Sequence, residues 1–438
     1  MSSDPSAVPV AMLGLAGFVV LTAGEVGGEV ELLVETTAAV TGCPSCGVVA
    51  TAHGRREHLL RDVPWGGRPV VLVWCKRVWR CDEPRCAKRT WTETSEHMTP
   101  RAVLTERARW WACQRVGRDG DSVARVAREL GVGWHTVMRA VRDHGHPLVD
   151  DPARLDNVAA LGVDEHVWQH ARPKRRTQYA TGIVDVTAGH PPRLLEVVPG
   201  RTGKVYADWI AAQQQGWREA IRVATLDPFR GYSTALCTQI PDATRVLDAF
   251  HVVALAVRVV DEVRRRVQQH TTGHRGHKDD PLYRVRRLLR AGAEQLTDDT
   301  RARLDAALQA GDPDLEVTIA WHCYQRLRAT YHHPDPEAGR GQAEKLLDQL
   351  HTCPIPEIAR LGRTLRSWRA EFLAYFDTDG ANNGPTEAIN LLIEKIRRIG
   401  HGFRNFDNYR LRLLLHCGVI WHTPPTPRIR NRSPRLVA

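Results

Sequence analysis

Cysteine is scarce in this chain, and its scarcity excludes the small disulfide-stabilised class of protein. Ten cysteines in 438 residues are too few for a scaffold held together by disulfide bonds. Four of them nevertheless form two close pairs, Cys43 with Cys46 and Cys81 with Cys86. Paired cysteines in a chain with few others indicate a metal site and reduced thiols.

Long hydrophobic runs are also missing. An apolar run at residues 11–22 is too short to cross a bilayer, and no Lys or Arg precedes it as a signal peptide requires. Together with residues 30–34 it predicts a small folded element instead. No other stretch reaches membrane length, so we expect a cytoplasmic protein with no membrane partner.

Positive charge is what the chain has in excess. It contains 61 Lys and Arg against 50 Asp and Glu, a net charge of +11. The excess gathers between Arg258 and Arg290 and again after Glu387. A clustered basic excess favours a nucleic-acid partner over a merely solvated surface. The length predicts two to four domains.

The two cysteine pairs predict a structural zinc site. Cys43 and Cys46 form a CxxC knuckle followed by glycine, and four residues separate Cys81 from Cys86. Four thiolates suit tetrahedral zinc and leave no open coordination position. Between the pairs the sequence predicts a hairpin with its turn at residues 65–67. Cys75 stays open as a substitute ligand, and four unrelated buried cysteines are the alternative.

Residues 121–139 have the spacing of a helix-turn-helix. The first helix would bury the apolar side chains Val123, Val126, Ala127 and Leu130. Gly131 would supply the tight turn. The second helix would present four side chains outward, namely Trp134, His135, Arg139 and Arg142. Ordinary packing of two helices is the alternative, but the basic chain and the neighbouring cysteine pairs favour DNA binding.

After residue 157 the pattern changes to short apolar runs separated by polar turns. Strands are predicted at 158–163, 179–186, 193–198, 221–226 and 244–250, with helices at 202–214 and 232–239. Three strands in a meander followed by alternating strands and helices is the order of a ribonuclease-H-like α/β sheet, although many α/β domains share it. Residues 251–376 are helical and Arg-rich, and a late helix is predicted from about 385 to 398.

Three carboxylates follow or begin these elements. Asp164 follows the first predicted strand, Asp227 follows the fourth, and Glu387 begins the late helix. Cleavage of a phosphodiester can use two divalent cations about 4 Å apart, and carboxylates are the ligands that magnesium prefers. Each residue also has a structural explanation, because strand-end aspartates cap helices and a glutamate near a helix start complements its dipole. Rival carboxylates by periodicity are Asp185, Asp248, Glu165 and Glu394.

Over nearly its whole length the chain resembles transposases of the insertion-sequence family written ISL-three. The blocks occur in the family's order: the cysteine pairs, the helix-turn-helix, then LGVDE, LDPFRGY, TRVLDAFHVV, NGPTEAIN and KIRRIGHGFRNFDNYRLRLLL. Two details depart from the family, which often has Gly where Ala388 follows the glutamate and Lys where Glu394 precedes Lys395. The wider spacing of the second cysteine pair also departs from it.

The resemblance implies a DDE catalytic core that uses two magnesium or manganese ions, besides the structural zinc. Asp164, Asp227 and Glu387 match the catalytic positions, and Asp248 and His251 match a block expected near the site in a supporting role. The implied function is binding the terminal inverted repeats of an insertion sequence, followed by DNA cleavage and strand transfer. The alternatives are a regulator or inactive transposase that only binds DNA, and less favourably a ribonuclease-H-like nuclease such as a resolvase.

The implied partners are double-stranded DNA, at transposon ends and target, and further copies of the chain in a homo-oligomer on the nucleoid. Phosphate contacts are expected from Arg397, Arg398, Arg404, Arg410 and Arg412. The expected segments are a strand-rich lead-in (1–40), a zinc-binding module (41–97), the helix-turn-helix domain (100–146), the first part of the ribonuclease-H-like core (155–257), a helical insertion (258–376), the last part of the core with the glutamate helix (377–421), and a basic tail expected to be disordered (422–438).

Overall fold

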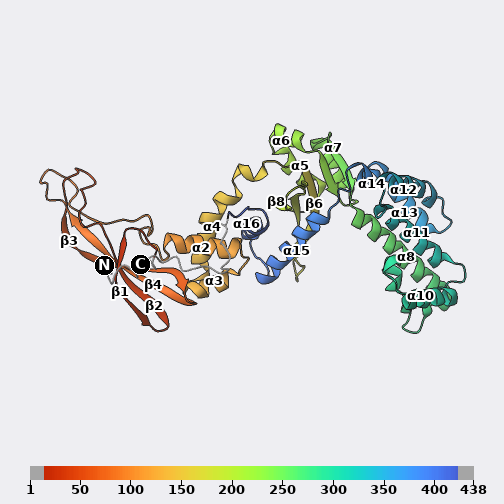
Figure 1. The fold of residues 1–438 in the computed structure, drawn as a ribbon, viewed down its shortest axis with the longest axis horizontal. Helices are drawn as coiled ribbons and strands as arrows, with labels where there is room; N and C mark the ends of the chain where they lie inside the picture. Colours follow the sequence, from red (N-terminus) through yellow and green to blue (C-terminus); the bar gives the residue numbers. More distant parts are fainter. Residues whose placement is uncertain (1–13, 423–438) are drawn as a thin grey trace, which may run out of the picture. The chain divides into compact units, whose positions relative to one another are not determined.

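The computed structural model describes residues 14–422, so the expectations for residues 1–13 and for the tail beyond 422 lie outside the described residues. The chain forms two compact units (Figure 1). Of the described residues, the first contains 14–154, Ile396–His401 and 407–422. The second contains Leu155–Lys395 and Gly402–Phe406.

The first unit begins with a five-stranded sheet in the order β1-β2-β4-β3, with β5 paired to β4. Its strands are β1 (Phe18–Val26), β2 (Glu29–Thr36), β3 (Thr51–Trp65), β4 (Arg68–Arg80) and β5 (Thr90–Thr92). The predicted hairpin is confirmed and is longer than expected. Gly66 and Gly67 form its turn with φ of 59° and 78°, values that suit glycine. Trp74 is fully buried within the apolar core of this sheet.

Three helices follow the sheet, and a fourth joins them from the end of the chain. They are α2 (Glu106–Gly117), α3 (Val123–Leu130), α4 (Trp134–Val149) and α16 (Phe406–Cys417). A Cβ added to Gly117 or Gly145 would lie 3.0 and 2.9 Å from side-chain atoms of Leu415, so α16 packs closely on α2 and α4. The expectation that residues 377–421 complete the core is therefore wrong for α16, because its leucines are buried against the helix-turn-helix unit.

The second unit contains a mixed sheet in the order β10-β9-β6-β7-β8. The antiparallel meander is β6 (Ala160–Gln169), β7 (Gln178–Asp185) and β8 (Arg193–Pro199), and β9 (Val223–Leu226) and β10 (Thr244–Leu247) continue it in parallel beside β6. The connecting helices are α5 (Gly203–Ala211), α6 (Gln215–Ala220) and α7 (Arg230–Gln239). All five predicted strands are present. The fifth is shorter than predicted, because Asp248 accepts a hydrogen bond from the His251 backbone and starts a helix.

The remaining helices of this unit form a bundle (Figure 1), and the last helix of the bundle packs against β10. They are α8 (Ala249–Thr272), α9 (Pro281–Arg284), α10 (Asp298–Gly311), α11 (Glu316–Tyr331), α12 (Pro336–Leu350), α13 (Pro356–Ser367) and α14 (Arg369–Asp377), and α15 (Gly384–Ile399) follows. Short breaks separate α11 from α12 at residues 332–335 and α12 from α13 at residues 351–355. One apolar core runs from the sheet into the bundle, so α8 crosses the expected boundary at residue 258 without a break.

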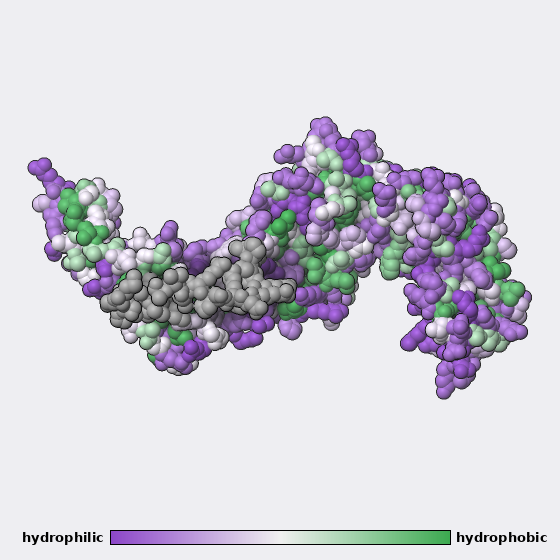
Figure 2. Space-filling model, viewed as in Figure 1, coloured by the Kyte–Doolittle hydropathy of each residue, from purple (hydrophilic) through white to green (hydrophobic). Residues whose placement is uncertain are grey.

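Hydrophilic residues predominate on the face of the helical bundle shown in Figure 2. Among the described residues, no helix combines the length and apolar character that crossing a bilayer demands.

Candidate active site and DNA-binding modules

The four paired cysteines meet in one place. The Sγ atoms of Cys43 and Cys86 lie 3.7 Å apart, and those of Cys46 and Cys81 lie 3.5 Å apart. A tetrahedron of thiolates at about 2.3 Å from zinc has edges of about 3.8 Å, so the donor set fits that ion. Hydrogen bonds from the knuckle outweigh burial and lower the pKa of Cys43 to about 7. Cys75 does not belong to this cluster and is excluded as a substitute ligand.

The helix-turn-helix has the predicted internal packing. Ser122 caps α3 by accepting a hydrogen bond from the Arg125 backbone, and Gly131 ends that helix with a φ of 64°. The four apolar side chains predicted to face inward from α3 are all buried. The four predicted outward side chains of α4, Trp134, His135, Arg139 and Arg142, are all exposed. Arg142 donates to Asn408 at 2.9 Å, within the same unit.

The five C-terminal arginines predicted to contact phosphates do not behave alike. Arg398 and Arg404 are exposed, whereas Arg397 and Arg410 are half-buried. Arg412 is only 4% exposed and donates to the Asp121 carbonyl at 3.1 Å. Burial lowers the pKa of Arg412 to about 10. The assignment of Arg412 to the DNA surface is therefore wrong, because its guanidinium is buried against the Asp121 carbonyl between α2 and α3.

Asp164 and Asp227 lie at the same level on neighbouring parallel strands. Gly162 on β6 is in register with Thr225 on β9, and each aspartate stands two residues further along its strand. Asp164 does not follow its strand as predicted, because β6 continues to Gln169. Asp227 directly follows β9. Parallel pairing thus brings two carboxylates that are far apart in sequence to the same edge of the sheet.

Asp164 is a largely buried carboxylate at this edge, and its pKa is raised. Burial, with the negative charges of Asp227 and Glu387 in addition, raises the pKa of Asp164 from 3.8 to about 7. Its carboxylate accepts hydrogen bonds from the Glu165 backbone at 2.7 Å and from the Asn390 amide at 2.6 Å. Glu387 is in the first turn of α15, the helix that also carries Asn390.

Asp227 is held in a second group with Asp248 and His251. His251 Nδ1 lies 3.0 Å from Asp227 Oδ1 and 2.8 Å from Asp248 Oδ2. Burial alone lowers the pKa of His251, but the hydrogen bonds to the two carboxylates outweigh it and raise that pKa to about 10. The structure thus brings both expected supporting residues to Asp227. The three side chains also place possible ligand atoms within 4.8 Å of one another.

Two asparagines of this site were missed by the sequence analysis. Asn390 contacts Asp164, and the amide nitrogen of Asn383 lies 3.4 Å from Asp227 Oδ1. Asn383 is fully buried immediately before α15. A signal existed for Asn390, because it stands three residues after Glu387 and so shares a helix face with it. Nothing local marked Asn383, whose partners come from distant strands.

Two of the rival carboxylates have structural partners of their own. Asp185 is fully buried and pairs with Arg193 at 2.8 Å, close to the start of β6. Glu165 follows Asp164 on β6 and therefore points to the other face of the sheet, where it accepts from the Tyr232 hydroxyl at 3.2 Å.

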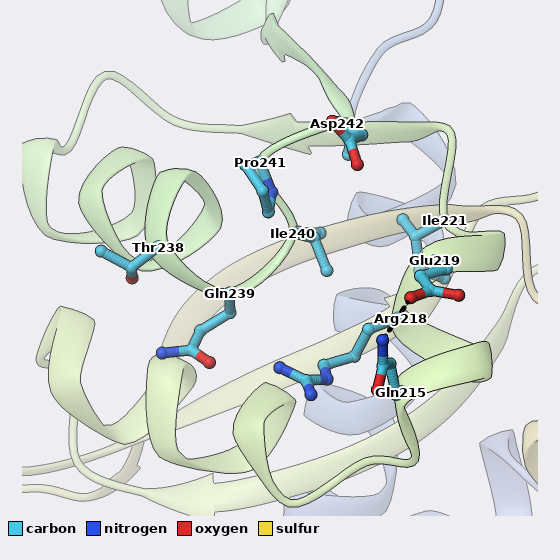
Figure 3. Close-up of a pocket in the computed structure, with 10 residues that line it drawn as sticks. Gln215, Arg218, Glu219, Ile221, Thr238, Gln239, Ile240, Pro241 and Asp242 are labelled. Carbon is cyan, nitrogen blue, oxygen red and sulfur yellow. Dashed lines mark hydrogen bonds between the residues drawn. The ribbon is translucent and has the colours of Figure 1, made fainter.

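A separate cavity of about 270 Å³ lies near α6 and α7 (Figure 3). Its lining includes Ile221, two residues before β9, and Ala243, directly before β10. Asp227 follows the other end of β9, so the cavity is at the opposite edge of the sheet from the carboxylates. It is not part of the acidic site.

Three family models match the chain in the order in which these parts occur. They are a zinc-finger of transposase IS204/IS1001/IS1096/IS1165 at residues 39–86, the helix-turn-helix domain of transposase family ISL3 at 93–145, and a transposase domain at 161–413. The combination defines a DNA transposase as the class of protein. The chain belongs to the ISL3 family of insertion-sequence transposases.

Individual relatives agree with this assignment. The transposase for insertion sequence element IS1001 of Bordetella parapertussis is 26% identical over 399 residues, covering 88% of this chain and 91% of the relative. The transposase for IS1557 of Mycobacterium tuberculosis is 27% identical over 337 residues, 71% of each chain. The Drosophila P element transposase strand transfer complex matches with a TM-score of 0.41 and 9% identity over 72% of this chain and 92% of that one. A structural likeness this distant carries no weight for the site.

Proposed function

We propose that this transposase is a DDE enzyme whose α/β unit is a ribonuclease-H-like core. Asp164, Asp227 and Glu387 are its catalytic carboxylates. The observation that carries the proposal is geometric: parallel pairing of β6 and β9 sets Asp164 and Asp227 at the same level, and Asn390, three residues after Glu387, donates to Asp164. The strand order, a meander followed by two parallel strands on the side of β6, supports the fold assignment.

The residues fit the divalent cations that such an enzyme needs. Three carboxylates whose charges repel one another are stabilised when cations enter between them, and hard oxygen ligands select magnesium or manganese. When bound, two such ions supply an activated water and stabilise the departing oxygen of a phosphodiester. The chain's own contribution is to hold the carboxylates at one sheet edge. His251 and Asp248 would support Asp227 from the start of α8.

The first unit would bind the DNA end that the carboxylate site cleaves. We assign α4 to the major groove, because its exposed first turns carry Trp134 and His135, and Arg139 follows on the next turn. The zinc module would extend recognition along the terminal inverted repeat. Exposed Arg398 and Arg404 would contact phosphates. Transposases that join two ends to a target act as oligomers in this scheme, so we propose a homo-oligomer on double-stranded DNA at the nucleoid.

The test is cleavage and joining of a labelled inverted-repeat duplex by the full chain with magnesium. Asp164→Asn, Asp227→Asn and Glu387→Gln should each reduce cleavage by at least about 10³-fold while leaving binding of the duplex unchanged. Asp208→Asn is the matched control, because Asp208 is an exposed carboxylate paired with Lys204 on α5. Wild-type cleavage by any of the three variants would contradict the assignment. Binding without cleavage by the wild type would favour a protein that only binds DNA.

A further inference from the structure

The helix that carries Glu387 also contacts both strand aspartates through neutral amides. Asn390 donates to Asp164 Oδ2 at 2.6 Å, and Asn383, just before the helix, lies 3.4 Å from Asp227 Oδ1. We propose that Asn383 and Asn390 are positioning residues that orient the two aspartates for cation binding. The inference rests on the proposed function of the three carboxylates and adds a role for α15 beyond supplying Glu387.

Asn383 ties the start of α15 to both aspartate-bearing strands. Its amide nitrogen donates to the Val163 carbonyl at 3.2 Å, one residue before Asp164 on β6. Its amide oxygen accepts from the Thr225 hydroxyl at 3.1 Å, two residues before Asp227 on β9. Its backbone N–H donates to Asp248 at 2.9 Å. A single fully buried side chain thereby fixes the helix against two strands.

Close packing makes this placement specific. Thr386 is 1% exposed, and a Cβ added to Gly162 would lie 2.1 Å from its Oγ1. The first turn of α15 therefore rests directly on the backbone of β6, where only glycine leaves room. Because Glu387 and Asn390 are three residues apart, they share the helix face that this packing positions. Movement of the helix would displace the glutamate and loosen the hold on both aspartates together.

Amides suit this task because they donate hydrogen bonds without adding charge. An arginine or lysine in place of Asn390 would neutralise Asp164 and compete with a cation for it. An amide fixes the carboxylate rotamer and leaves its charge available. Partners of this kind, which contact a ligand but not the metal, change metal affinity by about 10- to 100-fold when removed.

Mn²⁺ binding to the full chain without DNA tests the proposal, since electron paramagnetic resonance counts free Mn²⁺ directly and requires no catalysis. Asn390→Ala and the nearly isosteric Asn390→Leu should each raise the Kd for Mn²⁺ by about 10- to 100-fold. Their thermal midpoints in EDTA should stay close to wild type. Asn383→Ala should weaken Mn²⁺ binding and also lower that midpoint, because it breaks contacts to β6 and β9. Leu391→Ala, at a 74% exposed neighbour on α15, is the control and should bind Mn²⁺ normally.

The Mn²⁺ measurements distinguish the ligand role of the two aspartates from the positioning role of the two asparagines. Asp164→Ala and Asp227→Ala should abolish tight Mn²⁺ binding if the ligand assignment is right. If they abolish it while both Asn390 variants bind within twofold of wild type, the positioning role is overturned and the catalytic assignment stands. If the aspartate variants bind Mn²⁺ normally, the ligand assignment fails and the positioning role fails with it.

Discussion

Asp164→Asn should make the metal-free protein more stable while it destroys activity. The raised pKa means that ionised Asp164 opposes folding whenever no cation is bound. The rise from 3.8 to about 7 corresponds to about 4 kcal/mol at pH 8. An asparagine avoids the charge but weakens the hydrogen bonds from Glu165 and Asn390, each worth about 1 kcal/mol. A net gain of about 2 kcal/mol remains, or about 4–8 °C for a unit of this size.

The pH dependence follows from the sign of the shift. The pKa of Asp164 is higher in the folded chain than in the unfolded chain, so the unfolded chain loses this proton first as the pH rises. The contribution of Asp164 to wild-type stability therefore falls between about pH 4 and pH 7, and its penalty is complete above pH 7. The stability advantage of the Asp164→Asn variant should be full at pH 8. It should vanish at about pH 5, where the penalty on the wild type falls to about 2 kcal/mol, the amount that the variant loses in hydrogen bonds, and it should reverse near pH 4.

Thermal unfolding in EDTA at several pH values measures this difference, and repeating it with saturating magnesium provides a cross-check. Magnesium at about 100 times its Kd should stabilise the wild type by about 2.7 kcal/mol and should stabilise Asp164→Asn far less. Asp208→Asn should follow the wild type under every condition. An Asp164→Asn midpoint at or below the wild-type midpoint in EDTA at pH 8 would refute the reasoning, because it would mean that ionised Asp164 costs no folding free energy when no cation is bound.

Four further outcomes are expected. Cys81→Ser should lose bound zinc by metal analysis and increase hydrogen exchange around both cysteine pairs, while the sheet around Trp74 stays protected. Gly131→Ala should destabilise the helix-turn-helix by about 1–2 kcal/mol in a melting experiment, since its φ is 64°. Arg139→Ala should weaken binding to element-end DNA by about tenfold or more in a titration, whereas Arg412→Met should lower the thermal midpoint and leave the salt dependence of binding unchanged.

Local pattern was enough to predict the parts that depend on short-range spacing. The cysteine pairs, the apolar face of α3 and the order of the five strands all follow from residues close together in the sequence. The sequence also allowed the prediction that Asp164 and Asp227 lie side by side, because neighbouring parallel strands that each carry an aspartate near the end bring the two aspartates to one edge of the sheet. The continuation of β6 beyond Asp164 could not be predicted, since the polar second half of the strand lacks the apolar pattern of a buried strand.

Contacts between distant segments account for the errors. Arg412 stands among leucines on α16, and nothing in the local sequence shows that the helix is enclosed on the arginine's side as well. The same packing on α2 and α4 places α16 with the helix-turn-helix, although its sequence follows directly from the glutamate helix. A basic residue beside a basic cluster therefore predicts DNA contact poorly unless it is known whether the side chain is buried.

The asparagines of α15 show why a site can contain more than its charged residues reveal. Carboxylates were identified because their chemistry predicts metal binding, whereas an amide gives no such signal. A buried carboxylate still needs a polar partner that fixes its rotamer. At Asp164 that partner is the neutral amide of Asn390. At Asp227 the neutral amide of Asn383 stands beside His251, whose pKa rises to about 10 because hydrogen bonds to two carboxylates outweigh burial. Of these three partners, only His251 was named from the sequence.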